Sequence, residues 1–92
     1  MAEQETVFDA IRAERLLQDK KWGTDFGRLP ARKGRTDERW LTILAEEFGE
    51  VAEAVLRDND ADVVAELIQV AAVCVSWLEF RTERAEQMPY ER

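Results

Sequence analysis

The sequence predicts an all-α fold: an antiparallel helical bundle with three main helices per chain, completed by oligomerisation. Three segments with helical hydrophobic periodicity account for most of the 92 residues. A glycine-rich loop separates the first two segments, and a short polar turn separates the last two. The third segment is apolar on nearly every side, which is typical of a helix that is buried all round. Residues 1–92 are therefore expected to form one small helical domain.

The first predicted helix runs from about Gln4 to Trp22, where Val7 and Ile11 stand at helical spacing. Gly23 is expected to end it as a C-terminal cap. Residues 23–36 contain three glycines and one proline and are predicted to form a loop. The basic residues in and around this loop are either solvated charges or part of a flap that contacts phosphate groups; they are Lys20, Lys21, Arg28, Arg32, Lys33, Arg35 and Arg39.

The second predicted helix begins at a cap formed by Thr36 or Asp37 and ends near Arg57. Residues 58–60 form a short turn, and Asp60 is expected to cap a third helix that runs from Ala61 to about Arg84. The tail from Glu86 onward is expected to fray. Because the turn is so short, the second and third helices should form an antiparallel hairpin.

Composition narrows the classes of function. A net charge of −7 argues against general nucleic-acid binding, which needs a basic surface. The N-terminus lacks the pattern of a secretory signal, and the apolar stretch Leu67–Leu78 is expected to be too short to span a bilayer. The single Cys74 excludes an intrachain disulfide and is expected to be a reduced core residue. A cytoplasmic protein with no membrane and no nucleic-acid partner is expected.

Carboxylates in apolar surroundings are the feature of this sequence most directly linked to function. On the second helix, Glu47 falls within an apolar stripe and Glu50 at its edge, whereas Glu46 lies further round the helix. The other members of that stripe are Trp40, Leu44, Phe48, Val51 and Val55. A carboxylate directed at a core is costly unless it is paired or bound to a cation. Since the chain has no histidine, a hard, oxygen-seeking ion such as Mg²⁺ is the expected partner.

The third helix repeats this anomaly. Its few polar residues, Asp62, Glu66, Gln69 and Ser76, cluster on one side of an otherwise apolar helix. This arrangement predicts a polar pocket in the core, with Glu66 opposite Glu47 and Glu50 across the hairpin. In a purely structural interpretation, the glutamates are only solvated charges on an exposed face. This interpretation explains Glu46 well, but it explains Glu47 and Glu66 poorly.

The acidic pattern resembles that of the all-α nucleoside triphosphate pyrophosphohydrolases, which include MazG, the dimeric dUTPases and phosphoribosyl-ATP pyrophosphohydrolase. E-E-x-x-E on one helix, followed by E-x-x-D on the next, is the family signature. The segments similar to short, single-domain MazG-like proteins are Glu14–Gly23, Trp40–Val51 and Ala65–Trp77. The resemblance spans about two-thirds of the chain if the unmatched loop is counted.

The resemblance implies Mg²⁺-dependent hydrolysis of a nucleoside triphosphate to the monophosphate and pyrophosphate, with Mn²⁺ as an alternative ion and nucleotide-pool house-cleaning as the role. Glu46 and Glu47 would be the candidate general bases. Gln69 stands where the family has aspartate, and an amide is a weaker ligand for Mg²⁺, which leaves the number of ions open; Asp62 could supply the missing charge. The implied metal ligands are Glu46, Glu47, Glu50, Glu66 and Gln69, and the implied substrate contacts are Gln18, Lys21 and Trp22.

A helix that is apolar on most faces cannot be covered by two others, so a homodimer or higher oligomer is expected. The predicted interface includes Val64, Ile68, Ala72 and Val75. A second class of function stays open: a nucleotide sensor that binds without turnover, or a helical interaction module on the same scaffold, with Gln69 marking lost catalysis.

Overall fold

The structure is a computed structural model that describes residues 2–22 and 36–87, with the side chains of residues 3–20 and 36–82. It contains helix α1 (Ala2–Trp22), helix α2 (Asp37–Leu56) and helix α3 (Asp60–Gln87), and the described residues include no strand. The prediction of an all-α fold with three helices is confirmed for the described residues. Helix α1 begins two residues earlier than predicted, and α3 extends three residues beyond Arg84.

Helix α2 begins at the cap expected from the sequence. Thr36 has an extended backbone, and its Oγ1 accepts a hydrogen bond from the Arg39 N–H at 3.2 Å. This bond satisfies one of the free N–H groups in the first turn. Asp37 is the first helical residue, where its negative charge is favoured by the helix dipole.

The turn between α2 and α3 is built from backbone hydrogen bonds that reverse the chain within three residues. The Asp58 and Asn59 N–H groups donate to the carbonyls of Val55 and Ala54 at 3.0 and 3.1 Å. This pair of bonds is a Schellman motif, and it places Asp58 in the left-handed region at φ 59°. Glycine is the residue usually favoured at that position, because its lack of a Cβ removes the steric penalty.

The cap of α3 is Asn59, so the prediction that Asp60 caps this helix is wrong. Asn59 Oδ1 accepts from the Asp62 N–H at 3.1 Å, and Asn59 Nδ2 donates to Asp62 Oδ2 at 3.0 Å. The first bond caps one free N–H of the first turn of α3, and the second fixes the two side chains against each other. Asp62 Oδ2 also lies 4.0 Å from Arg57 Nη2, which ties its side chain to the turn.

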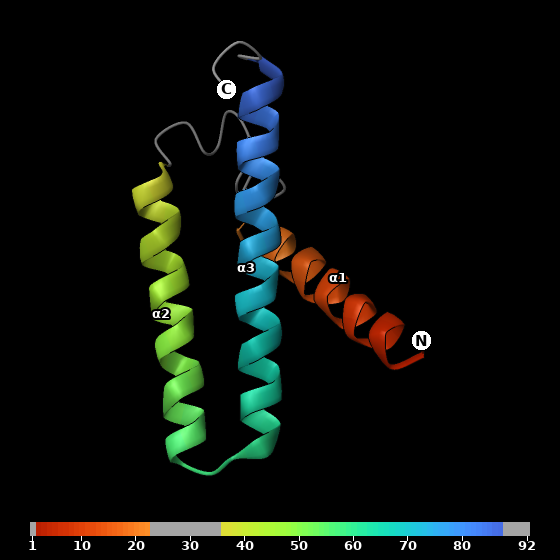
Figure 1. The fold of residues 1–92 in the computed structure, drawn as a ribbon, viewed down its shortest axis with the longest axis vertical. Coiled ribbons are helices and arrows are strands. Elements are labelled where there is room, and N and C mark those ends of the chain that lie inside the picture. Colours follow the sequence, from red (N-terminus) through yellow and green to blue (C-terminus); the bar gives the residue numbers. More distant parts are fainter. Residues whose placement is uncertain (1, 23–35, 88–92) are drawn as a thin grey trace.

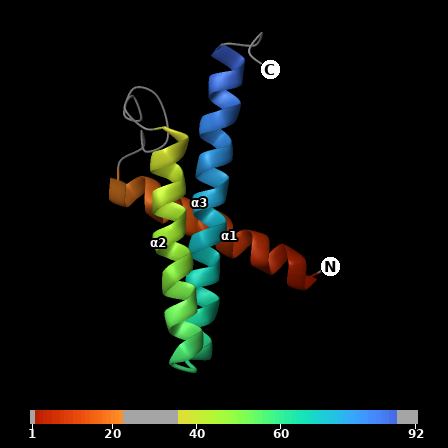
Figure 2. The same cartoon turned by 60° about the vertical axis from the view of Figure 1, so that its left-hand side comes forward.

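Helices α2 and α3 lie side by side, and α3 returns along α2 after the turn (Figure 1). Helix α1 crosses α3 obliquely and packs against it (Figure 2). The molecule measures 45 × 30 × 26 Å, with a radius of gyration of 14.6 Å. A compact chain of this length would have a radius of about 12 Å. The single chain is therefore more extended than a closed globule.

A continuous seam holds α2 and α3 together. The more buried positions of α2 recur at intervals of four and three residues, from Trp40 through Leu44, Glu47 and Val51 to Ala54. On α3 a row of half-buried and buried positions has the same spacing and runs through Asp62, Glu66, Gln69, Val73, Ser76 and Phe80. Trp40, Val73 and Phe80 form the apolar core at one end of this seam, with the Trp40 and Phe80 ring centroids 6.3 Å apart.

Much of the remaining apolar surface is uncovered in the single chain. Phe48 and Val55, expected in the same stripe as Trp40, are exposed, with 63% and 55% of their surface accessible. Ala72, expected at a subunit interface, is fully buried within the chain. The helical wheel merged two neighbouring faces of α2, of which only one meets α3.

Helix α3 contains a segment, Asp60–Thr82, that is long and apolar enough by length and composition to cross a membrane. It is longer than the apolar stretch Leu67–Leu78, to which the expectation from the sequence applied. Core helices of soluble proteins have the same length and composition. Only 22% of the most apolar window of this segment is buried within the chain, so α3 offers a large surface to a further partner.

Candidate metal centre

Three carboxylates meet across the α2–α3 seam. Glu47 and Glu50 lie one turn apart on α2, and Glu66 lies on α3; each offers an oxygen within 4.8 Å of the oxygens offered by the other two. The seam explains the meeting, because Glu47 and Glu66 occupy positions where a hairpin of this kind normally has apolar side chains. The sequence-based prediction that Glu66 faces Glu47 and Glu50 agrees with this geometry.

Two oxygens of the cluster are buried without a compensating bond. Glu47 Oε1 and Glu66 Oε1 are inaccessible to solvent and have no hydrogen-bond partner within the described part of the chain. The two residues are half-buried overall, whereas Glu50 is exposed. A buried polar oxygen left unsatisfied costs about 1–3 kcal/mol, and more when it is charged. The arrangement is therefore unfavourable unless a cation or protons neutralise it.

The electrostatics of the cluster favour the protonated carboxylates. Burial raises the pKa of Glu47, and the charges of Glu50, Glu66, Glu14 and Glu46 raise it further. The pKa of Glu66 is also raised, first by burial and then by a hydrogen bond and repulsion involving Glu50. The positive charge of Arg57 acts in the opposite direction on Glu66. Like charges held this close resist ionisation together.

The other predicted ligands lie at the margin of the cluster. Glu46 is exposed on α2 beside Glu47 and lies outside the group of three, although its charge contributes to the raised pKa of Glu47. Gln69 is half-buried on the seam, one turn beyond Glu66. Asp62, considered as a substitute for the missing aspartate, is instead bonded to Asn59 in the turn.

Helix α1 adds a residue that the sequence interpretation did not assign to the site. Glu14 is half-buried, and its charge is among those that raise the pKa of Glu47. Gln18, a predicted substrate contact one turn later, is only 2% exposed, and its Oε1 has no hydrogen-bond partner among the described residues. Glu14 is the first residue of the segment that is similar to MazG-like proteins. It lies four residues before Gln18, and this spacing was the sequence signal that the two side chains share a face of the helix.

The remaining predicted substrate contacts fall outside what the structure describes. Lys21 and Trp22 belong to the last turn of α1, but their side chains lie outside the described residues. The same holds for Arg28, Arg32, Lys33 and Arg35 in the segment between α1 and α2. The predicted phosphate-contacting flap therefore stays a prediction.

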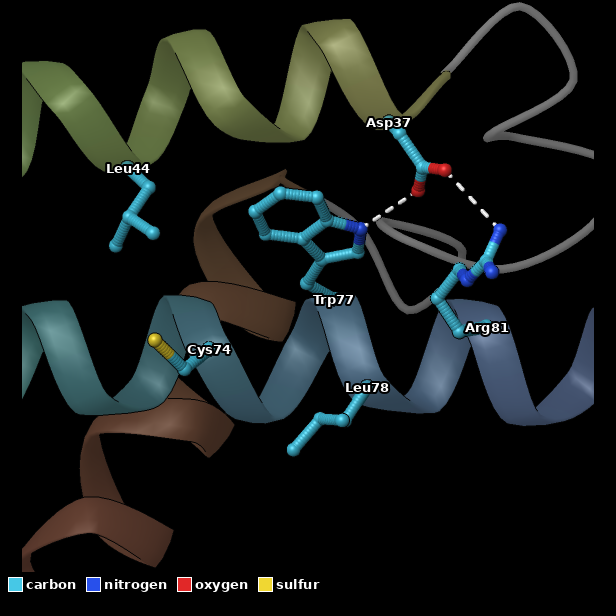
Figure 3. Close-up of a pocket in the computed structure, with 6 residues that line it drawn as sticks. All are labelled: Asp37, Leu44, Cys74, Trp77, Leu78 and Arg81. Atoms are coloured by element: carbon cyan, nitrogen blue, oxygen red, sulfur yellow. Dashed lines mark hydrogen bonds and ion pairs between the residues drawn. The ribbon is translucent and has the colours of Figure 1, made fainter.

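A separate pocket of about 570 Å³ opens between α2 and α3, near the start of α2. Asp37 accepts hydrogen bonds from Trp77 Nε1 at 2.8 Å and from Arg81 Nη1 at 3.0 Å across it (Figure 3). Leu44, Cys74 and Leu78 complete its mainly apolar lining. None of the residues that line this pocket belongs to the carboxylate cluster, although Leu44 lies only one turn before Glu47 on α2.

No protein-family model, curated protein or solved structure was found to match this chain. The fold and the cluster define a small all-helical protein whose two hairpin helices bring three carboxylates together at one point.

Proposed function

We propose that this protein is a Mg²⁺-dependent nucleoside triphosphate pyrophosphohydrolase, which converts a ribo- or deoxyribonucleoside triphosphate to the monophosphate and pyrophosphate. One observation supports this most strongly: Glu47, Glu50 and Glu66 converge within 4.8 Å, and two of their oxygens are buried without a partner. The resemblance of the acidic pattern to the MazG-like family supplies the reaction class. The protein is proposed to act in the cytoplasm on the nucleotide pool.

The donor set fits a hard divalent cation. Carboxylate oxygens are the ligands that Mg²⁺ prefers, and Mn²⁺ accepts the same set. Glu47, Glu50 and Glu66 would hold the ion, with Glu46 and Gln69 close enough in sequence to complete or support the ligand set. Such an ion, when bound, neutralises phosphate charge and lowers the pKa of a water molecule.

The side chains of the cluster differ in what they can do for the reaction. Glu46 is exposed and lies outside the group of three, so it is able to accept a proton from an attacking water. Glu47, the second candidate base, belongs to the group of three that would hold the ion, and its raised pKa is that of the cluster without an ion. Gln18, Lys21 and Trp22 are proposed to contact the nucleotide, because they match the corresponding segment of the MazG-like proteins.

The test is pyrophosphate release from a panel of ribo- and deoxyribonucleoside triphosphates, with Mg²⁺ and with a chelator. Glu47→Gln keeps the shape of the side chain but removes its charge, and is expected to lower turnover at least about a hundredfold. Glu53→Gln is the matched control, because Glu53 is exposed on the same helix and outside the cluster. If the folded wild-type protein released no pyrophosphate from any triphosphate of the panel, the proposal would be overturned.

The apolar surface of the hairpin supports assembly with a second copy. On α2, Leu41, Ala45, Phe48, Ala52 and Val55 recur at intervals of four and three and are exposed. On α3, Val64, Leu67, Ala71, Cys74 and Leu78 form a similar stripe, exposed or half-buried, that includes part of the pocket in Figure 3. Each helix of the hairpin therefore has one seam inside the chain and a second seam that is uncovered.

The exposed area is sufficient for a stable dimer. The chain exposes 6667 Å² of surface, against about 5,500 Å² for a folded monomer of its 10.7 kDa mass. The excess exceeds the ~800 Å² that each partner buries in an interface of standard size. We propose that two hairpins pair through these stripes to complete an antiparallel bundle. Light scattering after gel filtration tests this: a stable, folded monomer at micromolar concentration would refute it.

A second function is favoured by Gln69. A neutral amide stands on the seam where the family pattern has an acid, and a weakened metal site would suit a nucleotide sensor or an interaction module. A sensor would bind nucleotide without releasing pyrophosphate. An interaction module would do neither, and Glu47→Gln would stabilise it irrespective of Mg²⁺.

A further inference from the structure

One face of the hairpin carries no charged side chain over most of its length. On α2, the residue that directly follows each seam residue is apolar; these residues are Leu41, Ala45, Phe48, Ala52 and Val55. The same holds on α3 from Asp62 to Ser76, where the following residues are Val63, Leu67, Val70, Cys74 and Trp77. In a chain with 36% charged residues, two such rows are not typical of a surface that meets only water.

The two rows lie on the same side of the hairpin, and we call this side the uncharged face. A step of one residue turns by 100° about the helix axis. Because α3 returns along α2, this step leads to the same side of both helices. The pocket of Figure 3 lies there, since Cys74 and Trp77 line it together with Leu44 of α2. The rows end at Asp37 and Arg81, whose side chains are bonded to each other.

The opposite side of the hairpin differs in charge and in cover. With the exception of Ile43, the α2 residues directly before the seam residues are charged; they are Arg39, Glu46, Glu50 and Glu53. On α3 this side is where α1 packs, because Arg15 Nε and Nη2 donate to Glu79 Oε1 at 3.2 and 2.5 Å. Among the described residues, no helix packs on the uncharged face. Its larger members Leu41, Phe48, Val55 and Leu67 have between 49% and 63% of their surface exposed.

The pocket on the uncharged face is suited to apolar side chains. Asp37 Oδ1 accepts from Trp77 Nε1, and Asp37 Oδ2 accepts from Arg81 Nη1, so the polar groups at one end of the pocket are engaged with each other. The rest of the lining, Leu44, Cys74 and Leu78, is apolar. Few polar groups are therefore left to orient a small polar ligand. Polar groups that are already paired also cost less to cover than unpaired ones.

The geometry of the rows matches what a second copy of the chain would present. In a four-helix bundle with its helices at the corners of a square, each helix contacts two neighbours in directions about 90° apart. The seam and the row that follows it are 100° apart, so each hairpin helix has one row for its partner in the chain and one for a further helix. A second hairpin supplies two helices with the same spacing of four and three residues.

Size and shape also favour a second copy. The chain exposes 6667 Å² against about 5,500 Å² for a folded monomer of its mass, and the excess is larger than the ~800 Å² that one partner buries in a standard interface. On α2, large and small residues alternate through Leu41, Ala45, Phe48 and Ala52. Such alternation lets the side chains of two facing helices interdigitate.

We propose that a second copy of this chain covers the uncharged face and closes the pocket of Figure 3, so that the dimer is a four-helix bundle with α1 on its outside. The inference rests on the assembly proposed above. It adds that the pocket is filled by apolar side chains of the partner and is not a ligand site. Glu50 directly precedes a seam residue, so the carboxylate cluster of each subunit opens on the side away from the partner.

The experiment uses Cys74 as a probe, because it is the only cysteine of the chain and lines the pocket. The initial rate at which the full chain reacts with an aromatic disulfide reagent is measured from well below to well above micromolar protein concentration. Light scattering on the same samples gives the oligomeric state. Cys74 should react at least about tenfold more slowly in the dimer than in the monomer, since access of the reagent limits the reaction of a covered thiol.

Two variants show whether the uncharged face is responsible. Phe48→Glu should stay monomeric and react at the fast rate at every concentration, because it places a charge on the covered surface. Leu41→Glu, in the same row, serves this purpose if Phe48→Glu does not fold. Leu17→Glu is the matched control, since Leu17 on α1 is 59% exposed, close to the 63% of Phe48, and lies outside the face. This control should dimerise and react like the wild type.

Two results would overturn the inference. If the wild-type dimer and monomeric Phe48→Glu react at the same rate, the copies meet through another surface and the pocket stays open. If the wild type remains monomeric and equally reactive at all concentrations, no second copy covers the face, which is then left to a different partner. The measurement contains neither metal nor nucleotide, so its outcome is independent of the proposed hydrolysis, which pyrophosphate release tests separately.

Discussion

Removing one charge from the carboxylate cluster should stabilise the protein when no metal is bound. Two unit charges 4.8 Å apart repel by about 3.5 kcal/mol at an effective dielectric of 20, and by about 0.9 kcal/mol in water. Glu47 lies within this distance of both Glu50 and Glu66. Because Glu50 is exposed, its repulsion belongs nearer the water value. Glu47→Gln is therefore expected to raise the free energy of unfolding by about 1–3 kcal/mol near pH 7.5 in chelator.

The difference in stability between Glu47→Gln and the wild type should disappear in acid. Folding raises the pKa values of Glu47 and Glu66, so the folded protein binds more protons than the unfolded chain between the unfolded and folded pKa values. The stability of the wild type in chelator consequently falls as pH rises from the ordinary glutamate pKa through the raised values. Below about pH 4 the glutamates are largely protonated in both states, and the wild type and Glu47→Gln should unfold alike.

The assay is urea unfolding at fixed protein concentration, with chelator and with Mg²⁺, at a series of pH values. Mg²⁺ should stabilise the wild type and Glu53→Gln, whereas it should have little effect on Glu47→Gln. The reasoning is refuted if Glu47→Gln is less stable than the wild type in chelator at pH 7.5. Equal stabilisation of both proteins by Mg²⁺ would also refute it.

Three further predictions concern the turn and the exposed stripe. Asp58→Gly should raise the free energy of unfolding by about 0.5–1 kcal/mol, because Asp58 is in the left-handed region; urea unfolding that shows a loss would contradict this. Asn59→Ala should lower it by about 1 kcal/mol by removing the cap of α3, and an unchanged urea midpoint would argue against that role. Phe48→Glu should shift the protein toward monomer in sedimentation without lowering its helix content; an unchanged sedimentation coefficient would show that Phe48 lies outside the interface.

The helices and the carboxylate cluster could be predicted from the sequence because both depend on local spacing. Glu47 and Glu66 stand in the rows of residues that pack between α2 and α3. Helical periodicity and the short turn were therefore sufficient to predict that the two side chains meet. Thr36 was predictable as a cap for the same local reason. At the start of α3, Asn59 and Asp60 are neighbours and both good caps, and only the Schellman geometry of the turn selects Asn59.

Features that depend on which surfaces meet were not predictable. A helical wheel places Phe48 in the stripe of Trp40 and Val51, because it cannot separate a face that packs within the chain from an adjacent face that does not. The bonds of Arg15 to Glu79 join residues 64 positions apart in the sequence, and no local spacing indicates such a pair.

The most direct test of the central claim is a phosphorus magnetic resonance spectrum of the products formed from a mixture of nucleoside triphosphates in Mg²⁺. Nucleoside monophosphate and pyrophosphate resonances should appear with the wild type and with Glu53→Gln, and should be absent with Glu66→Gln or with chelator. Formation of orthophosphate together with a nucleoside diphosphate would contradict the proposed reaction. Undiminished product formation by Glu66→Gln would contradict the proposed role of the carboxylate cluster.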